Sequence, residues 1–443
     1  CYISIIFFWI ARDVIFTREL NTEMKNIIKF AKLGFDNDKY LRLQSEAILK
    51  RQKKFKHRLY LEIGGHFEHD AHASRVLPGF LPDNKIRILK LLGEAEIIYC
   101  INAKDIEMDR QFNAVVEHYP DYLISALKNF EKLNIPKPKI AINMYKNEYR
   151  KTDQFIKRLD DLNYTVAKRY IIDNYPNDLD LIASKDGYGK DDYIDVNSSL
   201  VVVMGPGSNN GKMSTCLGQV YHDNMRDIDS GYAKYETFPI WNFPLEHPVN
   251  YAYEAATADI GDYNAIDVNY FHKFGEKSVN YNRDIEAFPI VKNLCRRVTN
   301  RNNFMNTYSS PTEMGISNAG FAVSDDMLVR KTSREEIIRR YFWYKFYLKN
   351  KKVEQKSLDK IEEIMKKIKL LPDEIEVVRV ARKEHKASFQ FMDETIQVFN
   401  NVKELISKID PAKLSGSVVH SPVELASNDR VKLENAGVVY TDE

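Results

Sequence analysis

The chain has 443 residues, which is more than one hydrophobic core usually supports, so we expect two or three domains. Lys and Arg number 65 against 63 Asp and Glu, and this balance argues against nucleic-acid binding through bulk positive charge. The four cysteines are far apart and form no C-x-x-C pair, which argues against a disulfide framework and favours a reducing, cytoplasmic location.

The chain opens with a short apolar run from Tyr2 to Ile10. This run is far shorter than the roughly 20 apolar residues of a membrane span, and it lacks the basic leader of a secretory signal. We therefore expect no membrane partner, and we interpret residues 1–23 as extra sequence ahead of the first domain.

Short apolar runs then alternate with amphipathic, helix-like segments. Strands are predicted at 59–63, 95–102, 139–144, 165–171, 180–184 and 200–204, and helices at 82–93, 121–133, 153–162 and 251–258. Such alternation implies crossover connections and a mostly parallel sheet flanked by helices, an α/β, Rossmann-like fold. We expect one α/β domain at residues 24–199 and a second, which carries a glycine-rich turn, at residues 200–329.

The character of the sequence changes after Val329. Ser333-x-x-Glu336 has the pattern of a capping box and predicts the start of a helix. We expect a helical unit at residues 330–372, made of two helices broken near Asn350, and a small C-terminal α/β segment at residues 373–443. The aromatic residues of the first helix fit packing between domains, with a stacking platform for bases as the alternative, and they suggest a homo-oligomer.

The sharpest motif is the glycine-rich turn that joins the strand at 200–204 to a helix. Glycines let the backbone approach a phosphate, the helix N-terminus adds the positive end of a dipole, and a lysine supplies neutralising charge. The predicted phosphate-binding residues of this turn are Gly205, Gly207, Ser208, Asn209, Asn210, Gly211, Lys212, Ser214 and Thr215.

The turn departs from a Walker A loop at two positions. Pro206 and Met213 stand where that loop has a glycine and the hydroxyl residue that coordinates magnesium. Ser214 or Thr215 could take the second role only if the helix began later. ATP or another nucleotide with Mg²⁺ is the cofactor that the motif suggests, while the two departures argue against an ordinary Mg-ATPase. The alternative interpretation is a tight strand–helix turn without a ligand.

A polar and aromatic stretch runs from Gly231 to Asn250, and Asp259 follows the next predicted helix. Buried Lys, Glu and His need partners, so their density favours a pocket wall, with a solvated loop network as the alternative. We select Glu236 and Asp259 as candidate bases or metal ligands.

Histidines at positions 66, 69 and 72 follow the first predicted strand. The spacing resembles a metal site, but residues six apart point to different faces of a helix and no H-E-x-x-H motif is present, so no metal site is assigned. We expect His72 and Arg75 to contact an anionic ligand instead. Parallel sheets bind ligands at the carboxyl ends of their strands, where this glycine turn and the one at Gly205 would both lie.

Several blocks resemble one bacterial family, the domain of unknown function 1846. They are Lys32–Tyr40, His72–Phe80, Gly187–Lys190, Gly211–Met213, Tyr232–Asn242, Glu254–Asp259 and Val279–Asp284. The resemblance is dense between residues 30 and 320 and is expected to fade after Val329. It implies a multidomain α/β protein with an inserted helical unit and a phosphate-loop-like turn at Gly207, Gly211 and Lys212, and it brings no settled activity.

Three functions follow from these features. The first is a nucleotide-dependent transferase or hydrolase that acts on a phosphorylated small molecule, with Lys212, His72, Glu236 and Asp259 as candidate catalytic residues. The second is a non-catalytic protein that binds a phosphorylated metabolite in the same crevice and regulates another process. The third, less favoured, is a metal-dependent hydrolase built on the histidines.

Overall fold

The structure is a computed structural model that describes residues 33–65, 67, 70–110, 118–207, 209–349 and 353–370, together with four C-terminal strands. The expectations for residues 1–23, His66, His69 and Ser208 lie outside the described residues.

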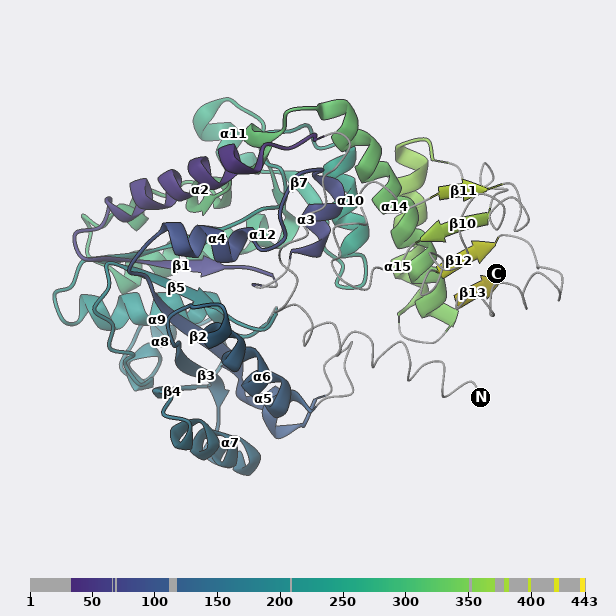
Figure 1. Ribbon diagram of the computed structural model, residues 1–443. Coiled ribbons are helices and arrows are strands. Elements are labelled where there is room, and N and C mark those ends of the chain that lie inside the picture. The colour runs from purple at the N-terminus through teal and green to yellow at the C-terminus, as the bar shows by residue number, and fades with distance from the viewer. Residues whose placement is uncertain are drawn as a thin grey trace.

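Seven parallel strands form the central sheet, in the order β4-β3-β2-β5-β1-β6-β9 (Figure 1). They are β1 (Arg58–Ile63), β2 (Glu96–Asn102), β3 (Lys139–Tyr145), β4 (Val166–Tyr170), β5 (Leu200–Met204), β6 (Ser230–Tyr235) and β9 (Gly315–Ile316). The α/β class with a parallel sheet is confirmed. Every residue of β5 is buried, because β5 lies between β2 and β1 with helices on both faces. The boundary expected at residue 200 therefore falls inside one sheet.

Helices cover both faces of this sheet. They are α2 (Asn37–Gln52), α4 (Asn84–Leu91), α5 (Ala103–Glu107), α6 (Tyr119–Lys132), α7 (Arg150–Asp161), α8 (Leu179–Ile182), α9 (Lys212–Asn224) and α12 (Asn282–Val298). Two further helices, α3 (Ala71–Val76) and α10 (Pro248–Ala256), pack against each other. Tyr60 of β1 donates to Asp223 of α9 at 2.9 Å, whereas Tyr235 of β6 bonds to Tyr40 of α2 at 2.7 Å. These contacts assign α9 to one face and α2 to the other, since side chains alternate along a strand.

The predicted strand at 180–184 is wrong. This segment is the short helix α8, and the side chain of Asp178 caps it by accepting the N–H of Leu181 at 2.9 Å. An acidic residue three positions before an apolar pair fits a helix start as well as a strand, and the local cap decided between them.

A smaller layer lies beyond β6. It contains a two-stranded antiparallel ribbon, β7 (Asn264–Ile266) and β8 (Val279–Tyr281), with α11 (Val268–Phe274) between the strands, and also α13 (Pro311–Met314). Val279 donates its N–H to the carbonyl of Trp241 at 2.9 Å, which ties the ribbon to the loop that follows β6.

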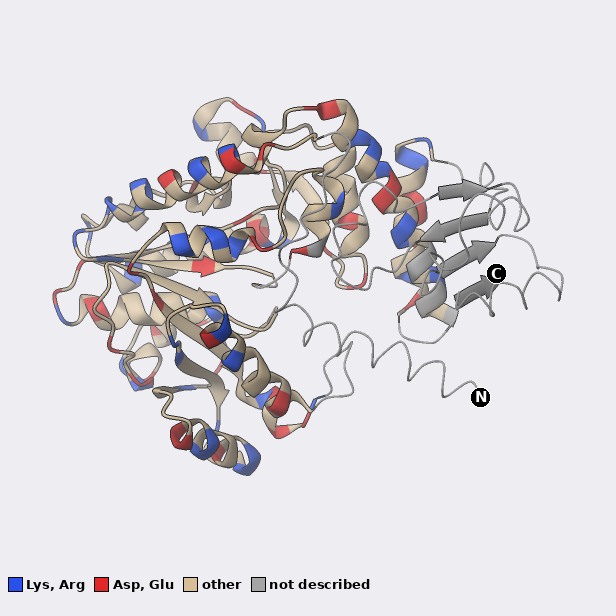
Figure 2. Cartoon of the chain, in the orientation of Figure 1, with Lys and Arg blue, Asp and Glu red and all other residues tan. Residues whose placement is uncertain are grey.

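Two long helices follow, α14 (Asp326–Lys349) and α15 (Gln355–Lys367), so the break predicted near Asn350 is confirmed. The predicted capping box is wrong, because α14 begins at Asp326 and contains both Ser333 and Glu336 in its interior. α14 packs against α10 and α3. Figure 2 shows residues of both charge signs close together on α14 and α15.

The C-terminal strands are β10 (Val378–Ala381), β11 (Gln397–Phe399), β12 (Val418–Ser421) and β13 (Val439–Asp442). They form a four-stranded sheet in the order β11-β10-β12-β13, in which β12 and β13 run parallel and the other pairs antiparallel. Of the helices that the structure describes, none combines the length and the apolar character needed to cross a bilayer.

Candidate functional site

The candidate site lies at the carboxyl edge of the sheet. β1 and β5 are parallel neighbours, with Glu62 opposite Val203, so the turns that follow them emerge side by side. One turn is Gly64–Gly65, and the other is the segment from Gly205 to Gly211 that leads into α9. This is the edge where open α/β sheets bind ligands, as expected from the sequence.

The backbone of the glycine-rich turn requires glycine at two positions. Gly211 has φ +75° as the N-cap of α9, and a Cβ there would lie 2.9 Å from the Cγ of Asn143. A Cβ on Gly205 would lie 2.6 Å from the carbonyl oxygen of Cys100. Asn209 also takes the left-handed conformation, with φ +60°, which asparagine tolerates better than most residues. The turn is thus packed closely against the ends of β2 and β3.

A buried polar network fixes the turn. Asn143 of β3 donates from Nδ2 to the carbonyl of Asn210 at 2.8 Å. Its Oδ1 accepts from Arg169 Nε at 3.0 Å and from Thr215 Oγ1 at 3.0 Å. Arg169 is held in turn by Asp191 at 2.9 Å. The hydroxyl of Thr215 is therefore bonded within the protein and supports the turn.

Lys212 stands at the first position of α9 and is 8% exposed. Its Nζ donates to the carbonyl of Gly207 at 2.6 Å, within the same turn. No carboxylate among the described residues lies within ion-pair distance of this ammonium group. The first N–H groups of a helix also have no partner inside the helix, and they carry the positive end of its dipole. The turn therefore gathers positive potential and N–H donors that suit an anion.

A second charged group lies at the end of β6. Lys234 Nζ contacts Glu236 Oε1 at 2.9 Å and also forms an ion pair with Asp284 of α12. Glu62 lies beside Lys234 in the sheet register and accepts from the hydroxyl of Tyr232 at 2.7 Å. Burial raises the pKa of Glu236 to about 7. Burial by itself would lower the pKa of Lys234, but the carboxylates of Asp284 and Glu236 raise it well above its usual value.

A series of aromatic contacts connects His72 to the charged group around Lys234 and Glu236. Its imidazole meets Phe238 and Tyr253 edge-on, with ring centroids 5.0 and 5.5 Å apart. The ring centroids of Tyr253 and Tyr281 are 5.2 Å apart, and the Nζ of Lys234 lies 5.7 Å from the Tyr281 ring centroid. Burial lowers the pKa of His72, so the ring is held neutral near physiological pH.

Arg75 belongs to a cluster that is centred on Glu336, which is 1% exposed. Three guanidinium Nε atoms, those of Arg75, Arg339 and Arg340, donate to this carboxylate at 3.0, 2.7 and 2.9 Å. His72 Nδ1 lies 3.4 Å from it. Burial acts to raise the pKa of Glu336, but the arginines hold it well below its usual value. The cluster joins α3 to α14.

The remaining candidates from the sequence are Asp259 and the histidines at positions 66 and 69. Asp259 follows α10, is exposed, and accepts from the hydroxyl of Tyr344 of α14 at 2.8 Å. It lies outside the path of contacts that links Glu236 to His72. Across the described ranges no three His, Cys, Asp or Glu side chains are grouped so that they could hold a metal ion, while His66 and His69 lie outside those ranges.

Sequence reasoning missed Asn102, Asn143 and Arg169. Asn102 and Asn143 come at the carboxyl ends of predicted strands, and Asn102 Nδ2 donates to the carbonyl of Asn209 at 3.4 Å. A search of every strand end for polar side chains would have found both asparagines. Arg169 lies inside β4 and carries no such local pattern.

Comparison with known proteins agrees with the resemblance noted in the sequence. Residues 33–369 match the family described as domain of unknown function DUF1846, N-terminal, so the match continues beyond Val329, where we expected it to fade. A UPF0371 protein of Corynebacterium aurimucosum is 48% identical over 311 residues, which are 70% of this chain and 62% of that protein. UPF0371 protein SUB1165 of Streptococcus uberis is 43% identical over 352 residues, 79% of this chain and 70% of that protein. The chain belongs to this family, and it spans less than two thirds of the corynebacterial relative.

Proposed function

We propose that the carboxyl edge of the sheet binds a phosphorylated small molecule, with a phosphate group at the glycine-rich turn. The observation that carries the proposal is the state of Lys212. This buried ammonium group has a neutral carbonyl as its hydrogen-bond partner, so an incoming anion would supply the opposite charge that the turn itself does not. The N–H groups at the start of α9 also favour an anion at this position.

The phosphate would be recognised by the protein itself rather than through a magnesium ion held by the first turn of α9. Met213 offers no oxygen, and the hydroxyl of Thr215 is bonded to Asn143 and to the carbonyl of Gly211. A nucleotide with Mg²⁺ would have to supply most of the metal's ligands from its own phosphates and water. ATP and other nucleotides therefore remain ligands to test beside simple phosphorylated metabolites.

Glu236 gives this site a group for acid–base chemistry. A carboxyl group with a pKa of about 7 exchanges protons near neutral pH, which suits a general acid or base. Lys212 would then neutralise negative charge that develops on a transferred phosphoryl group. On this proposal the protein is a phosphoryl-transfer or hydrolytic enzyme.

A thermal-shift screen of nucleotides and phosphorylated metabolites, with and without Mg²⁺, tests the proposal. A ligand at a hundredfold its Kd stabilises a protein by about 2.7 kcal/mol. We expect such a shift in the wild type and in Lys157→Ala, whose lysine is exposed on α7, and no shift in Lys212→Ala. Retained binding in a folded Lys212→Ala variant would sink the proposal.

The same samples separate an enzyme from a regulatory protein. A ligand that shifts the melting temperature is incubated with the protein at neutral pH, and the release or transfer of phosphate is measured. Turnover that falls in Glu236→Gln supports the enzyme. Binding with no turnover under any metal condition favours the alternative, a protein that senses a phosphorylated metabolite.

A further inference from the structure

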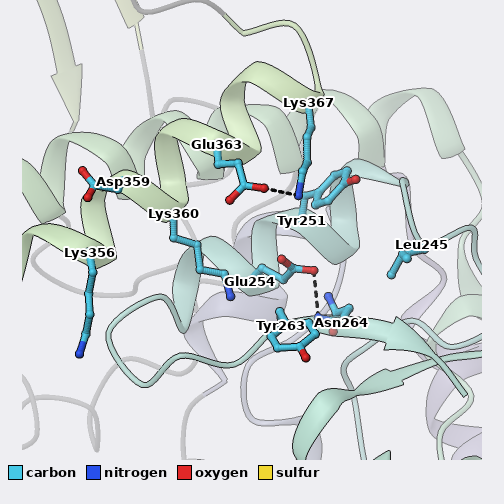
Figure 3. A pocket seen from close by; sticks show the side chains of 10 residues that line it. All are labelled: Leu245, Tyr251, Glu254, Tyr263, Asn264, Lys356, Asp359, Lys360, Glu363 and Lys367. Carbon is cyan, nitrogen blue, oxygen red and sulfur yellow. Dashed lines mark hydrogen bonds and ion pairs between the residues drawn. The ribbon is translucent and has the colours of Figure 1, made fainter.

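A second cavity lies between α10 and α15, and it is separate from the glycine-rich turn. Its volume is about 510 Å³, within the range of roughly 300–1,000 Å³ that is typical of small-ligand pockets. Figure 3 shows α15 above the cavity and α10 with the Tyr263–Asn264 segment below it. Neither the glycine-rich turn nor the charged group around Glu236 contributes to its lining.

The lining carries three lysines and three carboxylates, so its charges balance. On α15, Glu363 and Lys367 form an ion pair at 2.7 Å. Glu254 of α10 accepts the N–H of Asn264 at 2.9 Å through one oxygen. In Figure 3 its other oxygen points away from Asn264. Lys360 donates to the carbonyl of Asp262 at 2.7 Å.

Glu254 and Lys360 carry opposite charges and both line the cavity, but they do not form an ion pair with each other. Each is affected by the other's charge, yet within the described residues they form no ion pair. Burial raises the pKa of Glu254 and lowers the pKa of Lys360. Both side chains have therefore lost part of their hydration, and the hydrogen bonds that they form go to neutral backbone groups, those of Asn264 and Asp262.

The walls of the cavity add apolar surface. Tyr251 and Tyr263 both line it, and the ammonium of Lys360 lies 5.1 Å from the centroid of the Tyr263 ring. A ligand that carries both charges on a small body could meet Glu254 and Lys360 while the rings cover its remaining surface.

We propose that this cavity binds a free α-amino acid, whose ammonium group lies against Glu254 and whose carboxylate lies against Lys360. A simple anion would match Lys360 but would face three carboxylates, and a simple cation would face three lysines. A zwitterion satisfies both groups at once. The site is independent of the phosphate-binding proposal, because it shares no residue with the glycine-rich turn.

Isothermal titration calorimetry on the full chain tests this site, with each common amino acid as the probe at about 10 mM, tenfold above a Kd of about 1 mM. We expect at least one to bind. Its N-acetyl derivative and its amide, each of which lacks one charge, should bind at least about tenfold more weakly. No binding by any amino acid, or equal binding of the N-acetyl derivative, would overturn the proposal.

Variants locate the site. Lys360→Met and Glu254→Gln keep the length of each side chain and remove its charge, and we expect each to weaken binding by about tenfold or more. Lys366→Met is the matched control, because Lys366 is exposed on α15 and does not line the cavity. Melting curves show whether each variant is folded. Unchanged affinity in a folded Lys360→Met variant contradicts the assignment.

Discussion

The glycine-rich turn and the cluster around Glu336 hold their buried cations in opposite ways. At the turn, the ammonium of Lys212 is held by a neutral carbonyl of its own loop. In the cluster, the guanidinium groups of Arg75, Arg339 and Arg340 converge on one buried carboxylate. In the first arrangement the ammonium has no ion-pair partner among the described residues, whereas in the second the charges join α3 to α14.

This difference shows that a conspicuous basic residue is not by itself a ligand contact. We expected Arg75 to meet an anionic ligand, and the anion that it meets in the structure is the side chain of Glu336. Its role toward a ligand stays a prediction. What distinguishes a binding cation from a structural one is the partner that the fold already supplies, and stability and binding measurements on the two regions can test this distinction.

The largest effect is expected from Glu336→Gln. This change leaves three arginines close together without their shared carboxylate, and breaking a buried ion pair costs about 3–5 kcal/mol. Chemical denaturation measures the free energy of unfolding. The matched control is Glu46→Gln, whose exposed carboxylate pairs with Arg42 on α2, and it should change this free energy by about 1 kcal/mol or less. Similar effects of the two changes would show that the cluster is not structural.

The cluster also predicts a pH dependence. Because the pKa of Glu336 is far below its usual value in the folded protein, its contribution is complete above the pKa of an unfolded glutamate, about 4.3. It is lost as the pH falls from there through the lower folded value. Melting temperatures measured between neutral and acidic pH should therefore fall more steeply for the wild type than for Glu336→Gln. Parallel curves would contradict this.

An intermediate effect is expected from Asn143→Ala. The change removes the buried hydrogen bonds that Asn143 forms with the carbonyl of Asn210 and with the Nε of Arg169, at a cost of about 1–3 kcal/mol. It should also weaken phospho-ligand binding, because the turn loses its support. Asn293→Ala, at an exposed position of α12, is the control and should change stability by about 0.5 kcal/mol or less. Unaltered binding in Asn143→Ala would mean that the turn holds its shape without β3.

The smallest effect on stability is expected from Lys212→Met. The lost hydrogen bond to Gly207 is offset by removal of a buried charge, so the free energy of unfolding should stay within about 1 kcal/mol of the wild type. Phospho-ligand binding should nevertheless be lost. A loss of stability as large as that of Glu336→Gln would place Lys212 among the structural cations and remove the contrast between the two regions.

Local patterns in the sequence predicted much of the framework. Residues 200–204, with their apolar run, form the buried strand β5, and glycine and lysine follow as the start of α9. The repeated strand–helix alternation predicted the parallel sheet. Local patterns failed at α8 and at Ser333-x-x-Glu336, where short segments fit more than one structure. The domain boundary that we expected at residue 200 lies within a single sheet. The order of the strands in that sheet differs from their order along the chain, so local patterns do not reveal it.

The sequence by itself determined which segments become strands and helices, because burial favours periodic apolar residues, and it marked the turn at Gly211, because few residues other than glycine accept its backbone conformation. Only the tertiary structure decided which charges meet. Arg75 and Glu336 are 261 positions apart, and Glu254 and Lys360 share a cavity although they come from different helices. Whether a charged side chain binds a ligand or braces the fold depends on its partner and on the water it has lost, and both are set by packing between distant segments.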